Sequence, residues 1–151
     1  MKIEEQFTID APIDDVWTFV RDPATVAPCV PGCESVEPLS EKSYRSTGAV
    51  ALGPIKARFN VIVEITEEQP PHRLLCVTKG EEGGKASMLT ATSEIVLSER
   101  DSNSTAISCS SEVAIVGRLG KFGLGIMKKR AGQLAAEFAA AVQQRIQMAH
   151  A

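Results

Sequence analysis

The fold is decided by the stretch IKARFNVIVEIT at residues 55–66, in which apolar and polar side chains alternate. Phe59 and Val61 fall on one face of this stretch, and Arg58 and Asn60 fall on the other. A period of two is typical of a strand that buries one face. We therefore expect a sheet with one apolar side.

Similar alternation recurs from residue 34 to about residue 115, between segments rich in turn-forming residues. The expected strands cover residues 3–9, 43–51, 55–66, 73–79, 86–98 and 105–115, with a further one after residue 34. Residues 81–84 and 100–104 are typical of hairpin turns. The sequence therefore predicts an antiparallel meander of six strands, or seven with the first.

Helices are expected on either side of this meander. Pro12, followed by two aspartates, favours a helix start, and Pro23 stops that helix and begins a second short one that runs toward Cys29. Near the end, one apolar stripe returns at helical spacing and comprises Met127, Ala131, Leu134, Phe138, Val142 and Ile146. This order predicts an α+β fold in which a long C-terminal helix lies across the open face of the sheet.

Length and composition predict one globular domain over residues 1–151. The chain is 44% hydrophobic and 23% charged, which is ordinary for a globular protein. No apolar stretch approaches the ~20 residues of a membrane span, and the first six residues lack the apolar run of a signal peptide. We therefore expect a cytoplasmic protein.

Charge is distributed unevenly along the chain. Residues 1–117 carry 10 basic and 18 acidic side chains, a net −8, whereas residues 118–151 carry a net +5. The overall charge of −3 disfavours nucleic acid as a partner. The basic end predicts contact with an anionic membrane surface or an acidic partner protein; the alternative is a solvated helix face. The candidate contact residues are Arg118, Lys121, Phe122, Lys128, Lys129 and Arg130.

Two features favour a cavity between sheet and helix. Aromatic residues make up only 5% of the chain, and the helix stripe is flanked by alanines that add little volume; the alternative is that alanine permits close helix–sheet packing. Tyr44, Ser46 and Ser111 are candidates to bond a ligand's head group. The candidate cavity residues are Phe19, Val30, Tyr44, Gly48, Phe59, Val61, Val63, Cys76, Leu89, Cys109, Val113, Phe122, Ile126, Leu134 and Phe138.

The glycine-rich stretch at residues 117–125 lacks the Ser or Thr that a phosphate-binding loop places after its lysine. We expect a mobile hinge there, whose apolar and basic side chains gate the cavity or touch a membrane.

The sequence offers little for catalysis or metal binding. Alternation directs Glu94 and Glu112 toward solvent, and His72 falls in a turn. The four cysteines lack the spacing of a metal site and are expected to be free and structural. We therefore expect no catalytic residues, no metal and no covalent cofactor.

Several short motifs occur in order along the chain and together resemble the CoxG family of carbon monoxide dehydrogenase subunits, within the START-like, Bet v 1-like superfamily. They are Ala11-Pro12 with Val16-Trp17, Val30-Pro31-Gly32-Cys33, Tyr44 with Gly53-Pro54-Ile55, Gly83-Gly84, and Val116-Gly117-Arg118-Leu119. The resemblance implies a helix-grip fold, with a curved seven-stranded sheet wrapped around the long helix and an apolar pocket between them.

The resemblance also implies a role. Family members accompany molybdenum-containing carbon monoxide dehydrogenases or related hydroxylases, and are associated with membrane recruitment and with binding a quinone-like lipid. We therefore expect a non-enzymatic accessory protein, peripheral on the inner face of the membrane, with a bound quinone or lipid. Longer relatives continue into a tail, so any membrane contact here is expected at residues 117–130. The alternatives are a polyketide cyclase or dehydratase-like enzyme and a pure interaction module with an incidental cavity.

Overall fold

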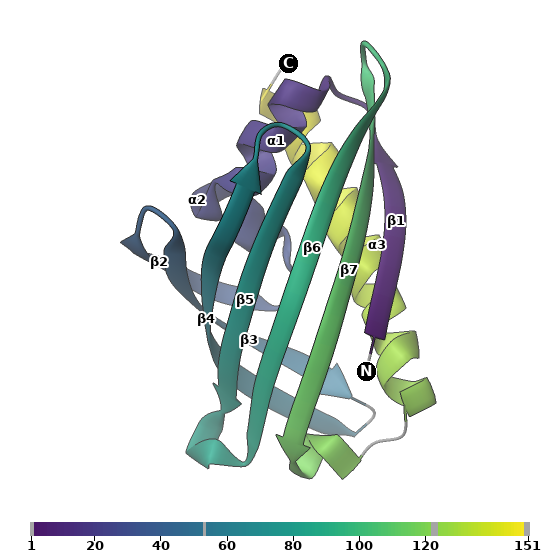
Figure 1. Ribbon diagram of the computed structural model, residues 1–151. Helices are drawn as coiled ribbons and strands as arrows, with labels where there is room; N and C mark the ends of the chain where they lie inside the picture. Colours follow the sequence, from purple (N-terminus) through teal and green to yellow (C-terminus); the bar gives the residue numbers. More distant parts are fainter. Residues whose placement is uncertain (1, 53, 122–123, 150–151) are drawn as a thin grey trace.

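The computed structural model describes residues 2–52, 54–121 and 124–149. It contains one antiparallel sheet, a pair of short helices and a long C-terminal helix (Figure 1). The strands are β1 (Lys2–Ile9), β2 (Cys33–Ser40), β3 (Ser43–Leu52), β4 (Ile55–Gln69), β5 (Arg73–Glu82), β6 (Ser87–Asp101) and β7 (Ser104–Gly117). The helices are α1 (Ile13–Arg21), α2 (Pro23–Val26) and α3 (Leu124–Ala149), with 3₁₀ turns η1 (Ala27–Cys29), η2 (Gly83–Lys85) and η3 (Arg118–Lys121).

The sheet order is β1-β7-β6-β5-β4-β3-β2, and every neighbouring pair is antiparallel. Helix α3 crosses one face of the sheet diagonally, while α1 and α2 cover the same face near the β4–β5 turn (Figure 1). The predicted helix-grip architecture and its seven strands are therefore confirmed.

Several boundaries differ from the prediction because cross-strand hydrogen bonding continues into the turns. Strand β5 extends through Glu82, so η2 makes the turn that the sequence places at residues 81–84. Only residues 102–103 separate β6 from β7, so this turn is shorter than the one predicted at residues 100–104. Pro12 precedes α1 as its N-cap rather than lying in its first turn.

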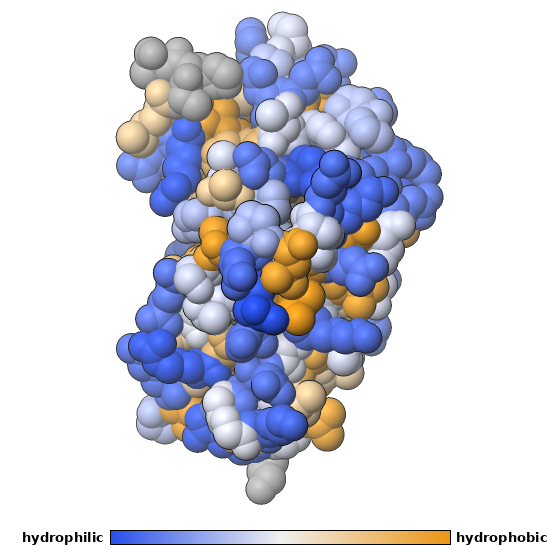
Figure 2. Space-filling model, turned by 90° about the vertical axis from the view of Figure 1, so that its left-hand side faces the viewer, coloured by the Kyte–Doolittle hydropathy of each residue, from blue (hydrophilic) through white to orange (hydrophobic). Residues whose placement is uncertain are grey.

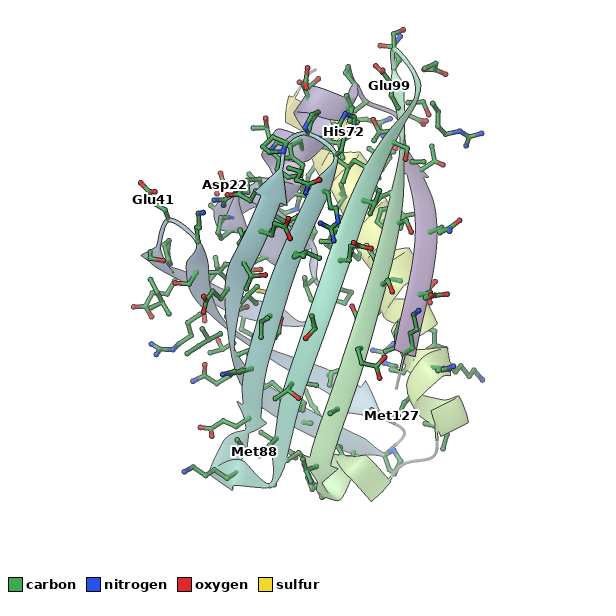
Figure 3. All side chains as sticks on the ribbon, in the orientation of Figure 1. Asp22, Glu41, His72, Met88, Glu99 and Met127 are labelled. Atoms are coloured by element: carbon green, nitrogen blue, oxygen red, sulfur yellow. The ribbon has the colours of Figure 1, made fainter. Side chains whose placement is uncertain are left out.

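Apolar packing is divided between two clusters at opposite ends of α3. The larger cluster joins α1 and the second half of α3 to the sheet, and includes Ile9, Val16, Leu97, Val142 and Ile146. The smaller cluster gathers around the buried side chains of Ala57 and Leu119, with Met127 of α3 packed against them. Met127 lies near the ends of β3 and β7, whereas His72 lies at the other end of the sheet (Figure 3). Residues of the smaller cluster, including Leu119 and Met127, also form part of the wall of a cavity between the helix and the sheet.

Candidate functional site: an apolar cavity beneath α3

A cavity of about 300 Å³ lies between the first half of α3 and the inward face of β3, β4, β6 and β7. Its wall is almost entirely apolar, and its volume is at the lower end of the range for small-molecule sites. Val30 lines the cavity and is nevertheless 49% exposed, so the cavity reaches solvent beside the loop at residues 30–33. Viewed from the side of β2, the surface is mainly hydrophilic, with apolar residues gathered near its middle (Figure 2).

Small side chains of both the helix and the sheet line the cavity. Ala131, in the first half of α3, and Gly48, on β3, both belong to the wall. Gly48 is required by close packing: a Cβ there would lie 2.8 Å from the carbonyl oxygen of Gly32. The loop at residues 30–33 therefore packs directly on β3 and forms one side of the wall.

Part of the predicted site is found in this wall. Seven of the candidates line the cavity: Val30, Gly48, Phe59, Val61, Leu89, Val113 and Leu134. These residues come from a loop, four strands and the helix, and the alternation in each strand directs them to the same side. The period of two thus predicted which face of the strands lines the cavity.

Other candidates pack in the larger apolar cluster instead. Phe19, Cys109 and Phe138 contact this cluster, and the Phe138 ring meets that of Phe7 edge to face with centroids 6.0 Å apart. They face inward as predicted, but α1 and the end of α3 fill the space on this half of the sheet.

Three more candidates lie next to the cavity without lining it. Tyr44 of β3 pairs with Val63 of β4, and this is the next inward-facing pair along the strands after Ser46–Val61. Cys76, on β5, lies one inward-facing position further from the cavity. The prediction that they line the wall is wrong because the cavity ends at the Ser46 row on these strands. Ile126 is also misplaced, since its side chain is 54% exposed. Phe122 lies outside the described residues.

Burial raises the pKa values of the Tyr44 phenol and of the Cys76 and Cys109 thiols. Burial, with the neighbouring thiols of Cys76 and Cys33, raises the pKa of Tyr44 to about 12. Burial, together with Cys76 and Glu5, raises the pKa of Cys109 to about 11, and burial also raises the pKa of Cys76. All four cysteines are free. Phenols and thiols held in their protonated form are poor general bases.

The stretch for which the sequence predicts a mobile hinge is anchored in its first half. The carboxylate of Glu82, only 4% exposed, accepts hydrogen bonds from Arg118 Nε and from Ser87 Oγ, the latter at 2.9 Å. The Ser87 hydroxyl in turn accepts the backbone N–H of Leu119 at 3.0 Å. The Arg118 hydrogen bonds hold the pKa of the Glu82 carboxyl below its usual value. This network fixes Leu119, 1% exposed, as part of the cavity wall.

The structure places the residues of the predicted basic contact surface in different surroundings. Arg118 is paired with Glu82, and Arg130 lines the cavity and donates from Nε to the Ala51 carbonyl oxygen at 2.9 Å. Lys128 and Lys129 are exposed. The side chain of Lys121 lies outside the described residues. Among the predicted cations whose side chains are described, Arg118, Lys128 and Lys129 are exposed, and Arg118 is held in an ion pair with Glu82.

Sequence reasoning missed several wall residues, chiefly Ile3, Leu119, Met127, Arg130 and Ala131. A signal for Arg130 was present, because residues 127, 130, 131 and 134 follow the i, i+3, i+4, i+7 spacing of one helix face. Because Arg130 is charged, it does not stand out as a member of the apolar stripe.

Comparison with known proteins agrees with this architecture. The family model for CoxG, described as a carbon monoxide dehydrogenase subunit, matches residues 6–147. The chain belongs to the CoxG family. No curated protein sequence matches it.

Solved structures resemble this CoxG-family chain in fold. A conserved protein from Geobacillus kaustophilus is 21% identical with a TM-score of 0.90, covering 98% of this chain and 96% of that one. A START superfamily protein from Mycobacterium smegmatis is 13% identical with a TM-score of 0.75, covering 97% of both chains. The Zhui aromatase/cyclase from Streptomyces sp. R1128 is 14% identical with a TM-score of 0.70, covering 97% of this chain and 93% of that one. At these identities the likeness shows the fold alone.

Proposed function

We propose that this CoxG-family chain is a non-enzymatic carrier that binds an apolar, quinone- or lipid-like molecule in the cavity beneath α3. The observation that carries the proposal is the cavity itself, about 300 Å³ with a wall that is almost wholly apolar. Each ~100 Å² of apolar ligand surface removed from water contributes about 2.5 kcal/mol to binding. Such a site favours ring systems and hydrocarbon chains over polar metabolites.

The wall chemistry favours a carrier over an enzyme. The titratable side chains that line the cavity, within the described residues, are Cys33 and Arg130, with no carboxylate or imidazole among them. A cyclase or dehydratase needs a positioned acid or base in contact with its substrate. Tyr44, Cys76 and Cys109, which that alternative would use, lie outside the wall with raised pKa values.

A direct titration tests the carrier function. We expect 2,3-dimethyl-1,4-naphthoquinone to bind the protein with one-to-one stoichiometry in isothermal titration calorimetry. This quinone has a methyl group at both reactive ring positions, so addition of a cysteine thiol does not complicate the measurement. Absence of saturable binding by this quinone and by a matched hydrocarbon would argue against the carrier function.

The family also suggests a partner. We propose that the protein serves a molybdenum-containing carbon monoxide dehydrogenase-type enzyme at the membrane, and that Lys128 and Lys129 contribute to the contact with anionic lipid. These lysines are exposed at the start of α3, close in sequence to the cavity residue Met127. None of the helices in the described ranges is both long and apolar enough to cross a bilayer.

Replacing Lys128 and Lys129 together by glutamine is expected to weaken binding to phosphatidylglycerol-containing vesicles. A cation at an anionic surface contributes about 1 kcal/mol, so we expect about a fivefold loss for each lysine in a vesicle sedimentation assay. The control replaces by glutamine the exposed Lys42, in the turn between β2 and β3, and the exposed Lys79, on β5. Equal losses in the two double variants would show that net charge, not this surface, determines binding.

A further inference from the structure

Arg130 is the one charged side chain among the described residues that line the cavity. It reaches the wall from the first half of α3, and its Nε bond to the carbonyl oxygen of Ala51 ties it to the end of β3. Its Nη1 also donates to Gln133 Oε1 at 3.3 Å. Both bonds are solvent-exposed, and they hold the planar guanidinium at the edge of an otherwise apolar space.

The guanidinium retains donors that the protein does not use. An arginine carries five N–H donors in a fixed fork. The bonds to Ala51 and Gln133 use Nε and one hydrogen of Nη1, and Nη2 has no hydrogen-bond partner within the described part of the chain. A donor at the edge of the cavity without a protein acceptor is available to an acceptor atom of a ligand or to water.

The hydroxyl groups of the wall are already engaged. Ser46 Oγ donates to the carbonyl oxygen of Ser35 at 3.0 Å, and the Thr47 hydroxyl is hydrogen-bonded to that of Ser35. Ser111, further along the sheet, is hydrogen-bonded to Ser93 at 2.8 Å. The serines that the sequence suggested for a head group therefore have partners within the protein, and Arg130 is the wall residue with donors to spare.

We infer that Arg130 determines the ligand specificity of the cavity by donating hydrogen bonds to a carbonyl or similar acceptor oxygen at one end of an apolar molecule. The inference rests on the proposed carrier function and adds the ligand's required chemistry and its orientation. The acceptor lies beside Arg130 and the end of β3, and the apolar remainder extends along Leu89 and Val113. Hydrocarbons that lack the acceptor fit the same space and bind less tightly.

The test compares two ligands that share one carbon skeleton, 2,3-dimethyl-1,4-naphthoquinone and 2,3-dimethylnaphthalene, by equilibrium dialysis. In Arg130→Met, a chain of similar length without donors, we expect quinone affinity to fall about tenfold, because a charged donor's hydrogen bond is lost. Hydrocarbon affinity should remain within about twofold of the wild type. Arg130→Lys, which keeps the charge and loses the fork, should show an intermediate loss for the quinone. The matched control is Arg145→Met, which removes an exposed arginine of the same helix outside the cavity wall and should change neither affinity.

The outcomes separate this inference from the proposed function. If the wild type binds both compounds but Arg130→Met weakens both equally, or neither, Arg130 only supports the wall and the inference is overturned. Failure of the wild type to bind either compound overturns the carrier function and the inference together. Selective loss of the quinone in Arg130→Met, with the hydrocarbon unaffected, supports both.

Discussion

Replacing Ala131 by tryptophan is expected to lower the affinity for 2,3-dimethyl-1,4-naphthoquinone by about 100-fold or more. Ala131 lies on α3 and its side chain faces the cavity, so an indole ring there would occupy much of the 300 Å³. Excluding ~110 Å² of apolar ligand surface removes about 2.7 kcal/mol of binding free energy, which corresponds to about two orders of magnitude. The free energy of unfolding should change by no more than about 1 kcal/mol, because the new side chain fills an existing space.

The measurement is calorimetric titration of the variant beside urea unfolding of the same preparation. Ala140→Trp is the matched control, because Ala140 is exposed on the same helix and lies outside the cavity. It adds the same aromatic group and should leave the affinity unchanged. Wild-type affinity in Ala131→Trp would place the ligand somewhere other than beneath α3.

Gly32→Ala is expected to lower the free energy of unfolding by roughly 3 kcal/mol. Gly32 has φ +84°, in the left-handed region that disfavours residues with a Cβ. A Cβ at this position would also overlap the carbonyl oxygen of Ala49, on the strand to which Gly32 is hydrogen-bonded. The strained backbone alone costs about 1–3 kcal/mol, and the overlap adds a shift of β3 against the 30–33 loop.

Urea unfolding followed by circular dichroism gives this value. Gly83→Ala is the control, because a Cβ there meets no atom within 4 Å and Gly83 does not have a positive φ. Its free energy of unfolding should stay within about 0.5 kcal/mol of the wild type or rise slightly. A Gly32→Ala protein as stable as this control would mean that the loop does not pack on β3 as described.

The fold could be predicted from the sequence because each of its elements has a pattern that is local in the chain. Alternation at residues 55–66 and the stripe from Met127 to Ile146 each depend on one element and its own period. The strand ends were harder to predict. Glu82 belongs to β5 because it pairs with Phe59 of β4, and its carboxylate is bonded to Ser87 and to the distant Arg118. No local pattern encodes these partners.

The site could be predicted only in part from the sequence. Alternation shows which face of a strand points inward, but it does not give the distance between the sheet and the helix that covers it. Val61 and Phe138 both face inward, yet one lines the cavity and the other packs in the core. That distinction depends on how α1 and the end of α3 fill one half of the sheet. Charge alone is also a poor guide to position: Arg118 is exposed and forms an ion pair with Glu82, whereas Arg130 lines the cavity.

The central claim is that the cavity carries an apolar molecule with a hydrogen-bond acceptor at one end. Its most direct test is organic extraction of the protein purified from its native cells, followed by mass spectrometry of the extract, with Ala131→Trp prepared in parallel. We expect a quinone- or lipid-like compound bearing a carbonyl or similar oxygen to be recovered from the wild type and strongly depleted in the variant. Recovery of no such compound from the wild type, or of equal amounts from both proteins, would contradict the claim.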